Sequence, residues 1–137
     1  MNQDDIRAAL VAEVEAVKAT FATYPLTIEY DNRIVVDPAT QVNPFLCVEV
    51  DVYDGWQADL SSNPIHRLLG MLILTAKVKV GSGVKQQTDL LDFFYPKLQR
   101  RKIGPAILEM AKPDKARTVG GWVGMSALIP FRADRTY

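Results

Sequence analysis

Residues that commonly carry chemistry are scarce in this chain of 137 residues, which has one cysteine, Cys47, and one histidine, His66. A single cysteine excludes an internal disulfide and a cysteine-based zinc site. No apolar run reaches the roughly 18 residues that a membrane-spanning helix needs, and the polar start MNQDD is unlike a signal peptide. We therefore expect a protein that resides or assembles in a cytosol, with no membrane partner.

Neither sign of charge is in excess over the whole chain, because 16 acidic residues balance 16 basic ones. The charges are nevertheless unevenly placed. Residues 1–66 hold eleven acidic and three basic residues, a net charge of −8, whereas residues 97–137 hold nine basic and three acidic ones, a net charge of +6. This asymmetry indicates an interaction surface, unless the fold interleaves the two halves and mixes their charges.

Hydrophobic periodicity predicts two helices. The second helix is expected to begin after the turn Gly81-Ser82-Gly83. It should end near Tyr95, because Pro96 lacks an N–H. Its expected apolar stripe is Val84, Thr88, Leu91 and Tyr95. The first helix is expected over residues 4–21, with the stripe Ile6, Leu10, Val14, Val17 and Phe21.

Alternating apolar and polar residues predict strands. Their ranges are 26–30, 44–52, 70–80, 106–110 and 122–132, with a short segment at 34–36. The run over residues 70–80 is the most apolar and is expected at the centre of the fold, with one side made of Leu72, Leu74, Ala76, Val78 and Val80. The last strand should place on one face Val123, Met125, Ala127, Ile129 and Phe131.

Two segments without a period are expected to be connections. Residues 53–67 carry the turn signals Asp54-Gly55 and Asn63-Pro64, which predict a long loop that is mobile in an isolated subunit. Lys112-Pro113-Asp114 predicts a turn. The whole chain, residues 1–137, is expected to form one domain.

No recognisable catalytic or cofactor motif is present. Gly81-Ser82-Gly83 lacks the third glycine of a dinucleotide fingerprint, since Gln86 stands there. Cys47 and His66 are conceivable partners in a small hydrolase, although Cys47 is expected within a strand. Three acids lack the spacing of a calcium loop: Asp51, Asp54 and Asp59. We therefore expect a protein that is not an enzyme and has no catalytic residue, no cofactor and no metal.

The residues that we single out are candidates for an interface with a partner. Trp56 either anchors a partner or folds back on the core. The densest basic cluster consists of Lys97, Arg100, Arg101 and Lys102. Without stacking aromatic residues among these bases, a protein-binding patch or a solvated loop is favoured over nucleic-acid binding.

Several segments together resemble a known family: PLTIEYDN, then NPFLCVEV, a strand ending in VGSG, a helix with DLLDFFYP, and a closing GGW…ALIPFRAD. This arrangement, over residues 6–134, is similar to the phage tail-terminator-like family, small tail-completion proteins of long-tailed phages and prophages. The resemblance implies an α+β fold, with a mainly antiparallel or mixed sheet packed by the N-terminal helix and the helix after the central strand.

The resemblance also implies a role in the virion tail, assembled in the bacterial host cytoplasm. Members form rings, typically six-fold, which stop polymerisation of the tail tube and offer a head-joining surface. The implied partners are further copies of the chain, the tail-tube protein and a head-completion protein, with no sequence-specific nucleic acid. The resemblance is compatible with a subunit that is monomeric in isolation.

A charge pairing between subunits is our hypothesis for the ring. Asp54 and Asp59 would face Arg100 and Arg101 of the neighbouring copy, with apolar contact from Trp56. Two alternatives stay open at this point: a nucleic-acid- or ligand-binding domain that uses the basic C-terminal half, and a small hydrolase that uses His66.

Overall fold

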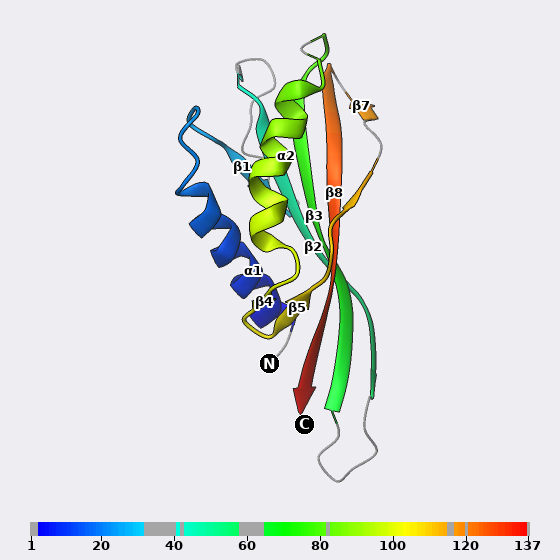
Figure 1. The fold of residues 1–137 in the computed structure, drawn as a ribbon. Coiled ribbons are helices and arrows are strands. Elements are labelled where there is room, and N and C mark those ends of the chain that lie inside the picture. The colour runs from blue at the N-terminus through cyan, green and yellow to red at the C-terminus, as the bar shows by residue number, and fades with distance from the viewer. Residues whose placement is uncertain are drawn as a thin grey trace.

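In the described part of the chain, a mixed sheet of eight strands carries two helices on one face (Figure 1). The computed structural model describes residues 3–31, 41, 43–57, 65–81, 83–114, 117–119 and 121–136. Its elements are, in chain order, α1 (Gln3–Lys18), β1 (Ile28–Tyr30), β2 (Phe45–Gln57), β3 (Ile65–Lys79), α2 (Lys85–Leu98), β4 (Lys102–Ile103), β5 (Ala106–Leu108), β6 (Lys112–Pro113), β7 (Arg117–Val119) and β8 (Trp122–Thr136).

The strands follow the order β1-β2-β3-β8-β5-β4, and β6 and β7 also pair with β8. The β1–β2 pair is parallel, and all the other described pairs are antiparallel. The predicted single-domain α+β fold with a mixed, mainly antiparallel sheet is confirmed. Neither α1 nor α2 is long and apolar enough to cross a membrane.

The core lies between the helices and the sheet face that they cover. The alternation predicted for the central strand is confirmed, because Leu72, Leu74, Ala76 and Val78 are buried and the intervening residues are half-buried. Val80 lies beyond the end of β3 and is exposed. The helices and the other strands bury Ile6, Leu10, Val14, Leu46, Val48, Phe94, Leu98, Ile129 and Phe131 against the same core.

Both helices differ in detail from the prediction. Helix α1 ends at Lys18 and not at residue 21, although Phe21 still packs edge-on against Phe93. Helix α2 continues past Pro96 to Leu98, because the proline is exposed and removes only one hydrogen bond near the helix end. The predicted stripe of α2 is wrong at its start, since Val84 and Thr88 are exposed; the buried residues are Gln87, Leu90, Leu91, Phe94 and Leu98.

The expected loop over residues 53–67 is largely strand. Strand β2 continues to Gln57 and β3 begins at Ile65, and the two strands stay paired in this region. A bulge between Val52 and Asp54 shifts their register, which breaks the period-two pattern in the sequence. The remaining residues 58–64 lie outside the described residues, as does the segment 34–36.

The segment after β5 also differs from the prediction. Lys112 and Pro113, expected in a turn, form strand β6 opposite Leu128 and Ala127 of β8. A proline is tolerated there because β6 has no strand on its other side in the described sheet.

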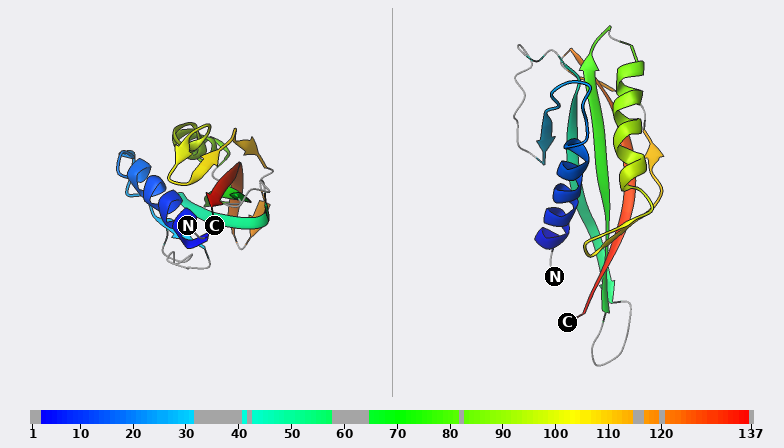
Figure 2. Two further views of the ribbon diagram at one scale, coloured as in Figure 1. Left: turned by 90° about the horizontal axis from the view of Figure 1, so that it is seen from below. Right: turned by 60° about the vertical axis from the view of Figure 1, so that its left-hand side comes forward.

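Three strands project beyond the helices and form an arm (Figures 1 and 2). The arm consists of residues 53–57 of β2, 65–69 of β3 and 132–136 of β8, which pair side by side. The 15 residues of β3 span about 50 Å at 3.3 Å per residue, whereas the 14 residues of α2 span about 21 Å. The strand β3 is therefore more than twice as long as α2, and its residues 65–69, a third of the strand, form its part of the arm.

Candidate functional site

The basic residues singled out in the sequence gather where α2 ends and β4 begins. Lys97 lies in the last turn of α2, where its Nζ donates a hydrogen bond to the Phe93 carbonyl oxygen at 2.8 Å and lies 3.8 Å from the centre of the Phe93 ring. Arg101 donates from Nη1 to the Lys97 carbonyl oxygen at 2.6 Å. These two side chains are therefore held within the subunit.

Arg101 also forms an ion pair with an acidic residue of its own chain. Its Nη1 lies 2.8 Å from Oε1 of Glu13 on α1. The fold thus brings a base of the C-terminal half against an acid of the N-terminal half, and at this position the charges of the two halves mix. Arg101 is consequently a poorer candidate for a contact between subunits than Arg100 or Lys102.

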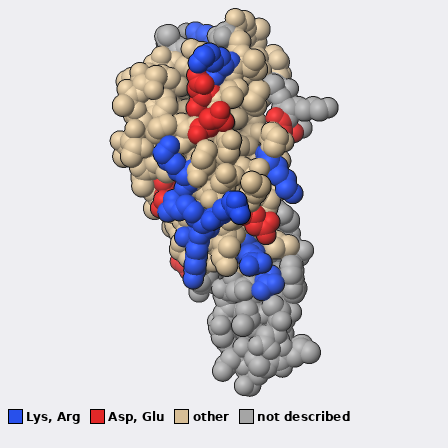
Figure 3. Space-filling model, viewed as in Figure 1, with Lys and Arg blue, Asp and Glu red and all other residues tan. Residues whose placement is uncertain are grey.

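Arg100 and Lys102 are exposed, and neither makes an ion pair or side-chain hydrogen bond with another described residue. Arg100 has a φ of 56°, a left-handed conformation that allows its N–H to reach the Glu109 carbonyl oxygen at 3.2 Å. Lys102 pairs across β4–β5 with Ile107. Figure 3 shows basic side chains gathered on this side of the molecule.

Two exposed apolar side chains accompany these bases. Ile107 is 39% exposed and Met110 is 58% exposed, although both are large and hydrophobic. We name this surface the corner patch, which consists of Arg100, Lys102, Ile107 and Met110. Glu109 is an acidic residue within the same stretch.

A second candidate surface lies on the face of the sheet away from the helices. Because side chains alternate along a strand, the residues between the buried ones of β2 and β3 point to this face. Glu49 pairs with Ile73, and Asp51 pairs with Met71. The two acids are exposed and the two apolar residues are half-buried. We name this surface the sheet patch: Glu49, Asp51, Met71 and Ile73.

Side chains form hydrogen bonds with the backbone at the edge of β2 beside the sheet patch. Pairing with β1 ends at Tyr30 and Val48, and the Asp31 carboxylate then accepts a hydrogen bond from the Val50 N–H at 3.0 Å. Arg7 of α1 forms an ion pair with Asp31 and donates to the Val50 carbonyl oxygen at 3.1 Å. Both backbone groups of Val50 are therefore satisfied without a neighbouring strand.

Two of the other predicted interface residues lie on the arm. Asp54 pairs with Leu69, and Trp56 pairs with Arg67, in the part of the β2–β3 ladder that follows the bulge. Their side chains, like the whole of Asp59, lie outside the described residues. The structure therefore places Asp54 and Trp56 on the arm and the four basic residues near the end of α2.

The residues considered for a hydrolase do not meet. Cys47 pairs with Thr75, whereas His66 lies nine residues away from Thr75 on the same strand, a separation of about 30 Å. Among the described residues no group of three or more acids, histidines and cysteines is placed to hold a metal ion.

The thiol of Cys47 is held in its protonated form. Burial raises its pKa to about 11 from an ordinary value of 9.0; nearby Lys77 opposes the shift and Glu29 adds to it. Sγ lies 3.5 Å from Oε1 of Glu29, which accepts its hydrogen bond. A thiolate, which nucleophilic catalysis requires, is therefore disfavoured at neutral pH.

We expect folded Cys47 to react with iodoacetamide at pH 8 about 100-fold more slowly than in the unfolded chain, because a pKa near 11 leaves about that much less thiolate. Since the folded pKa is raised, the protonated thiol contributes stability below pH 9 that is lost as the pH rises towards 11. Mass spectrometry of alkylation with and without urea measures the ratio. Equal rates in both states would contradict this assignment.

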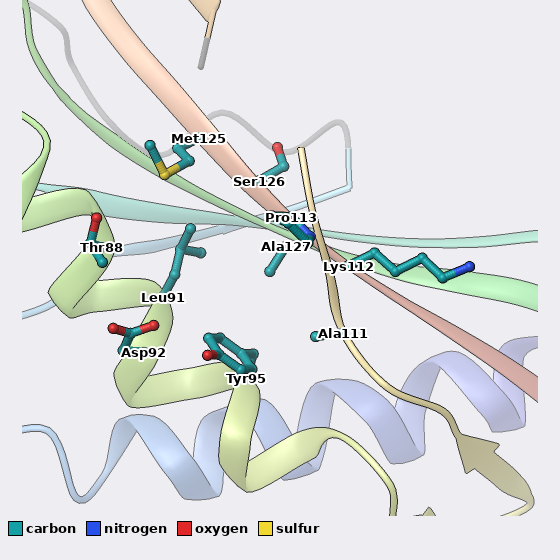
Figure 4. Close-up of a pocket in the computed structure, with 10 residues that line it drawn as sticks. All are labelled: Thr88, Leu91, Asp92, Tyr95, Ala111, Lys112, Pro113, Met125, Ser126 and Ala127. Atoms are coloured by element: carbon teal, nitrogen blue, oxygen red, sulfur yellow. The ribbon is translucent and has the colours of Figure 1, made fainter. Parts of the chain in front are cut away.

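A cavity of about 240 Å³ lies between α2 and β8 (Figure 4). Leu91 and Met125 contribute apolar surface, Thr88 and Asp92 contribute polar atoms from α2, and Lys112 extends away from the others. The volume is below the 300–1,000 Å³ that is typical of ligand pockets. Its ten lining residues include neither Cys47 nor His66, so it does not complete the hydrolase arrangement.

Comparisons with known proteins bear on the fold alone. No family model matches the chain, and no curated protein matches it. Matches to 14 chains of solved structures were found. One of these, whose name states no function, aligns with a TM-score of 0.65 and 17% sequence identity over 98% of this chain and 95% of its own length. This likeness supports an α+β fold shared over nearly the whole chain.

Proposed function

We propose that this protein is a structural tail protein of a long-tailed phage or prophage, a tail terminator whose copies form a ring on the end of the tail tube. The ring stops tube polymerisation and presents a surface to a head-completion protein. The family resemblance in the sequence motivates the proposal, and the α+β fold is compatible with it.

The observation that carries the proposal is the arm. Strands β2, β3 and β8 extend beyond the helix layer, so this small domain has a long projection that its own helices do not cover. On the arm, residues 53–57 of β2 have no strand on their other side in the described sheet. Projecting strands with an open edge are suited to contact with another chain.

Addition of the protein to polymerising tail-tube protein from the same phage genome tests the proposal. We expect shorter tubes, with a ring at one end of each tube in negative-stain electron micrographs. Trp56→Ala, on the arm, is expected to raise the protein concentration needed for capping by at least about tenfold, because an aromatic anchor often dominates an interface. The control Thr118→Ala changes an exposed residue of β7 and should cap like the parent. Tubes of unchanged length, with bare ends, would refute the proposal.

A further inference from the structure

The corner patch and the sheet patch lie on different sides of the subunit. The β4–β5 hairpin curls towards α1, since a Cβ on Gly104 would lie 2.7 Å from Cβ of Ala9. The corner patch thus sits at the helix side of the molecule. The sheet patch lies on the opposite face, because the alternate residues of β2 and β3 are buried beneath the helices. Two different surfaces on opposite sides are what a head-to-tail interface requires.

The two patches are also complementary in character. The corner patch combines two bases, which make no ion pair with the described residues, with exposed Ile107 and Met110. The sheet patch combines two exposed acids, which make no ion pair with other described residues, with half-buried Met71 and Ile73. Contact between them would remove apolar surface from water and place charges of opposite sign together.

We propose that the corner patch of one subunit docks on the sheet patch of the next copy, with Arg100 and Lys102 facing Glu49 and Asp51. This inference rests on the proposed ring and replaces the pairing of Arg100 and Arg101 with Asp54 and Asp59. Arg101 keeps its ion pair with Glu13 within the subunit. The occupant of each patch is thus a second copy of this chain.

Charge favours this head-to-tail arrangement over twofold contacts through either patch. Two corner patches that met about a twofold axis would bring bases against bases, and two sheet patches would bring acids against acids. One rival dimer remains: Arg132 is exposed on the sheet face beside β3, and a face-to-face dimer would bring it near Asp51. The rival predicts dimers, whereas head-to-tail contacts continue to a closed ring or a longer assembly.

Two charge-reversed variants and their mixture test the inference. The acid-reversed variant carries Glu49→Lys and Asp51→Lys, and the base-reversed variant carries Arg100→Glu and Lys102→Glu. We expect the parent to self-associate below about 1 mM at low salt, measured by sedimentation velocity and native mass spectrometry. Each variant alone should associate at least about tenfold more weakly. An equimolar mixture should recover assembly, with the two variants alternating, in species larger than a dimer.

The matched control for the acid-reversed variant carries Asp89→Lys and Asp92→Lys, which make the same change in net charge on the exposed side of α2. It should associate like the parent, and circular dichroism should show that all variants are folded. The inference would be overturned if the parent stayed monomeric to about 1 mM at low salt, or if the charge-reversed variants associated like the parent. It would also be overturned if the mixture did not recover assembly, or if assembly stopped at a dimer. Assembly that follows the expected pattern without capping tubes would instead refute the proposed function alone.

Discussion

Replacement of Gly70 with alanine is expected to lower the free energy of unfolding by about 3 kcal/mol, the upper end of the range for overpacking. Gly70 pairs with Phe131 across β3 and β8, and the Phe131 ring lies over it. A Cβ at this position would come within 3.0 Å of both the ring and the carbonyl oxygen of Asp51. The ring is fully packed in the core, and the carbonyl belongs to the neighbouring strand, so neither can move cheaply.

Urea unfolding followed by circular dichroism measures this effect. The control is Gly124→Ala in β8, where the nearest atom to an added Cβ is Cγ2 of Thr75 at 3.0 Å. A side-chain methyl group can adjust, so the control should change stability by less than about 1 kcal/mol. A Gly70→Ala protein as stable as the parent would show that the Phe131 ring does not occupy this position.

Replacement of Gln87 with leucine is expected to cost about 2 kcal/mol of stability, because two backbone carbonyl oxygens would lose a hydrogen bond in a buried or half-buried setting. Gln87 is the one buried polar residue of the described chain, at 1% exposure. Its Nε2 donates to the carbonyl oxygen of Ala76 on β3 at 3.2 Å and to that of Val123 on β8 at 2.6 Å. The side chain therefore joins α2 to two neighbouring strands.

The neighbouring residue supplies the control for this prediction. Gln86 is exposed on α2, so Gln86→Leu makes the same chemical change in solvent and should alter stability by less than about 0.5 kcal/mol. The two midpoints in urea are compared directly. If both variants unfolded at the same midpoint, the two hydrogen bonds of Gln87 would not contribute to the stability of the fold.

Helix α1 and the central strand can be predicted from the sequence because each buries one periodic face. The alternation of Leu72, Leu74 and Ala76 predicts the central strand, and all three are fully buried. The stripe of α1 predicts a helix in the same way, and Ile6 and Leu10 lie in the core. The α+β class follows from the family resemblance and is confirmed by the sheet and helices.

The arm was not predictable, because a single bulge conceals it. The extra residue between Val52 and Asp54 reverses the alternation of β2, and the turn signal Asp54-Gly55 then reads as a loop. In the arm, β3 pairs with β2 on one side and with β8 on the other, and these ladders supply the hydrogen bonds that hold the arm extended. The β8 partners of β3 lie far away in the sequence, so local residue preferences do not reveal the sheet that holds the arm.

For the candidate surfaces, too, the sequence determined one part and the tertiary structure the other. The sequence by itself identified the basic cluster and the excess of acids in the first half, because composition requires no knowledge of the fold. Only the tertiary structure decided that Arg101 pairs with Glu13 within the subunit, and that Arg100 and Lys102 make no ion pair with the described residues. It also decided that Glu49 and Asp51 lie exposed on the sheet face away from the helices. Gln87 is buried for the same reason: the carbonyl groups that satisfy it come from two strands that the fold, and not the local sequence, places beneath α2.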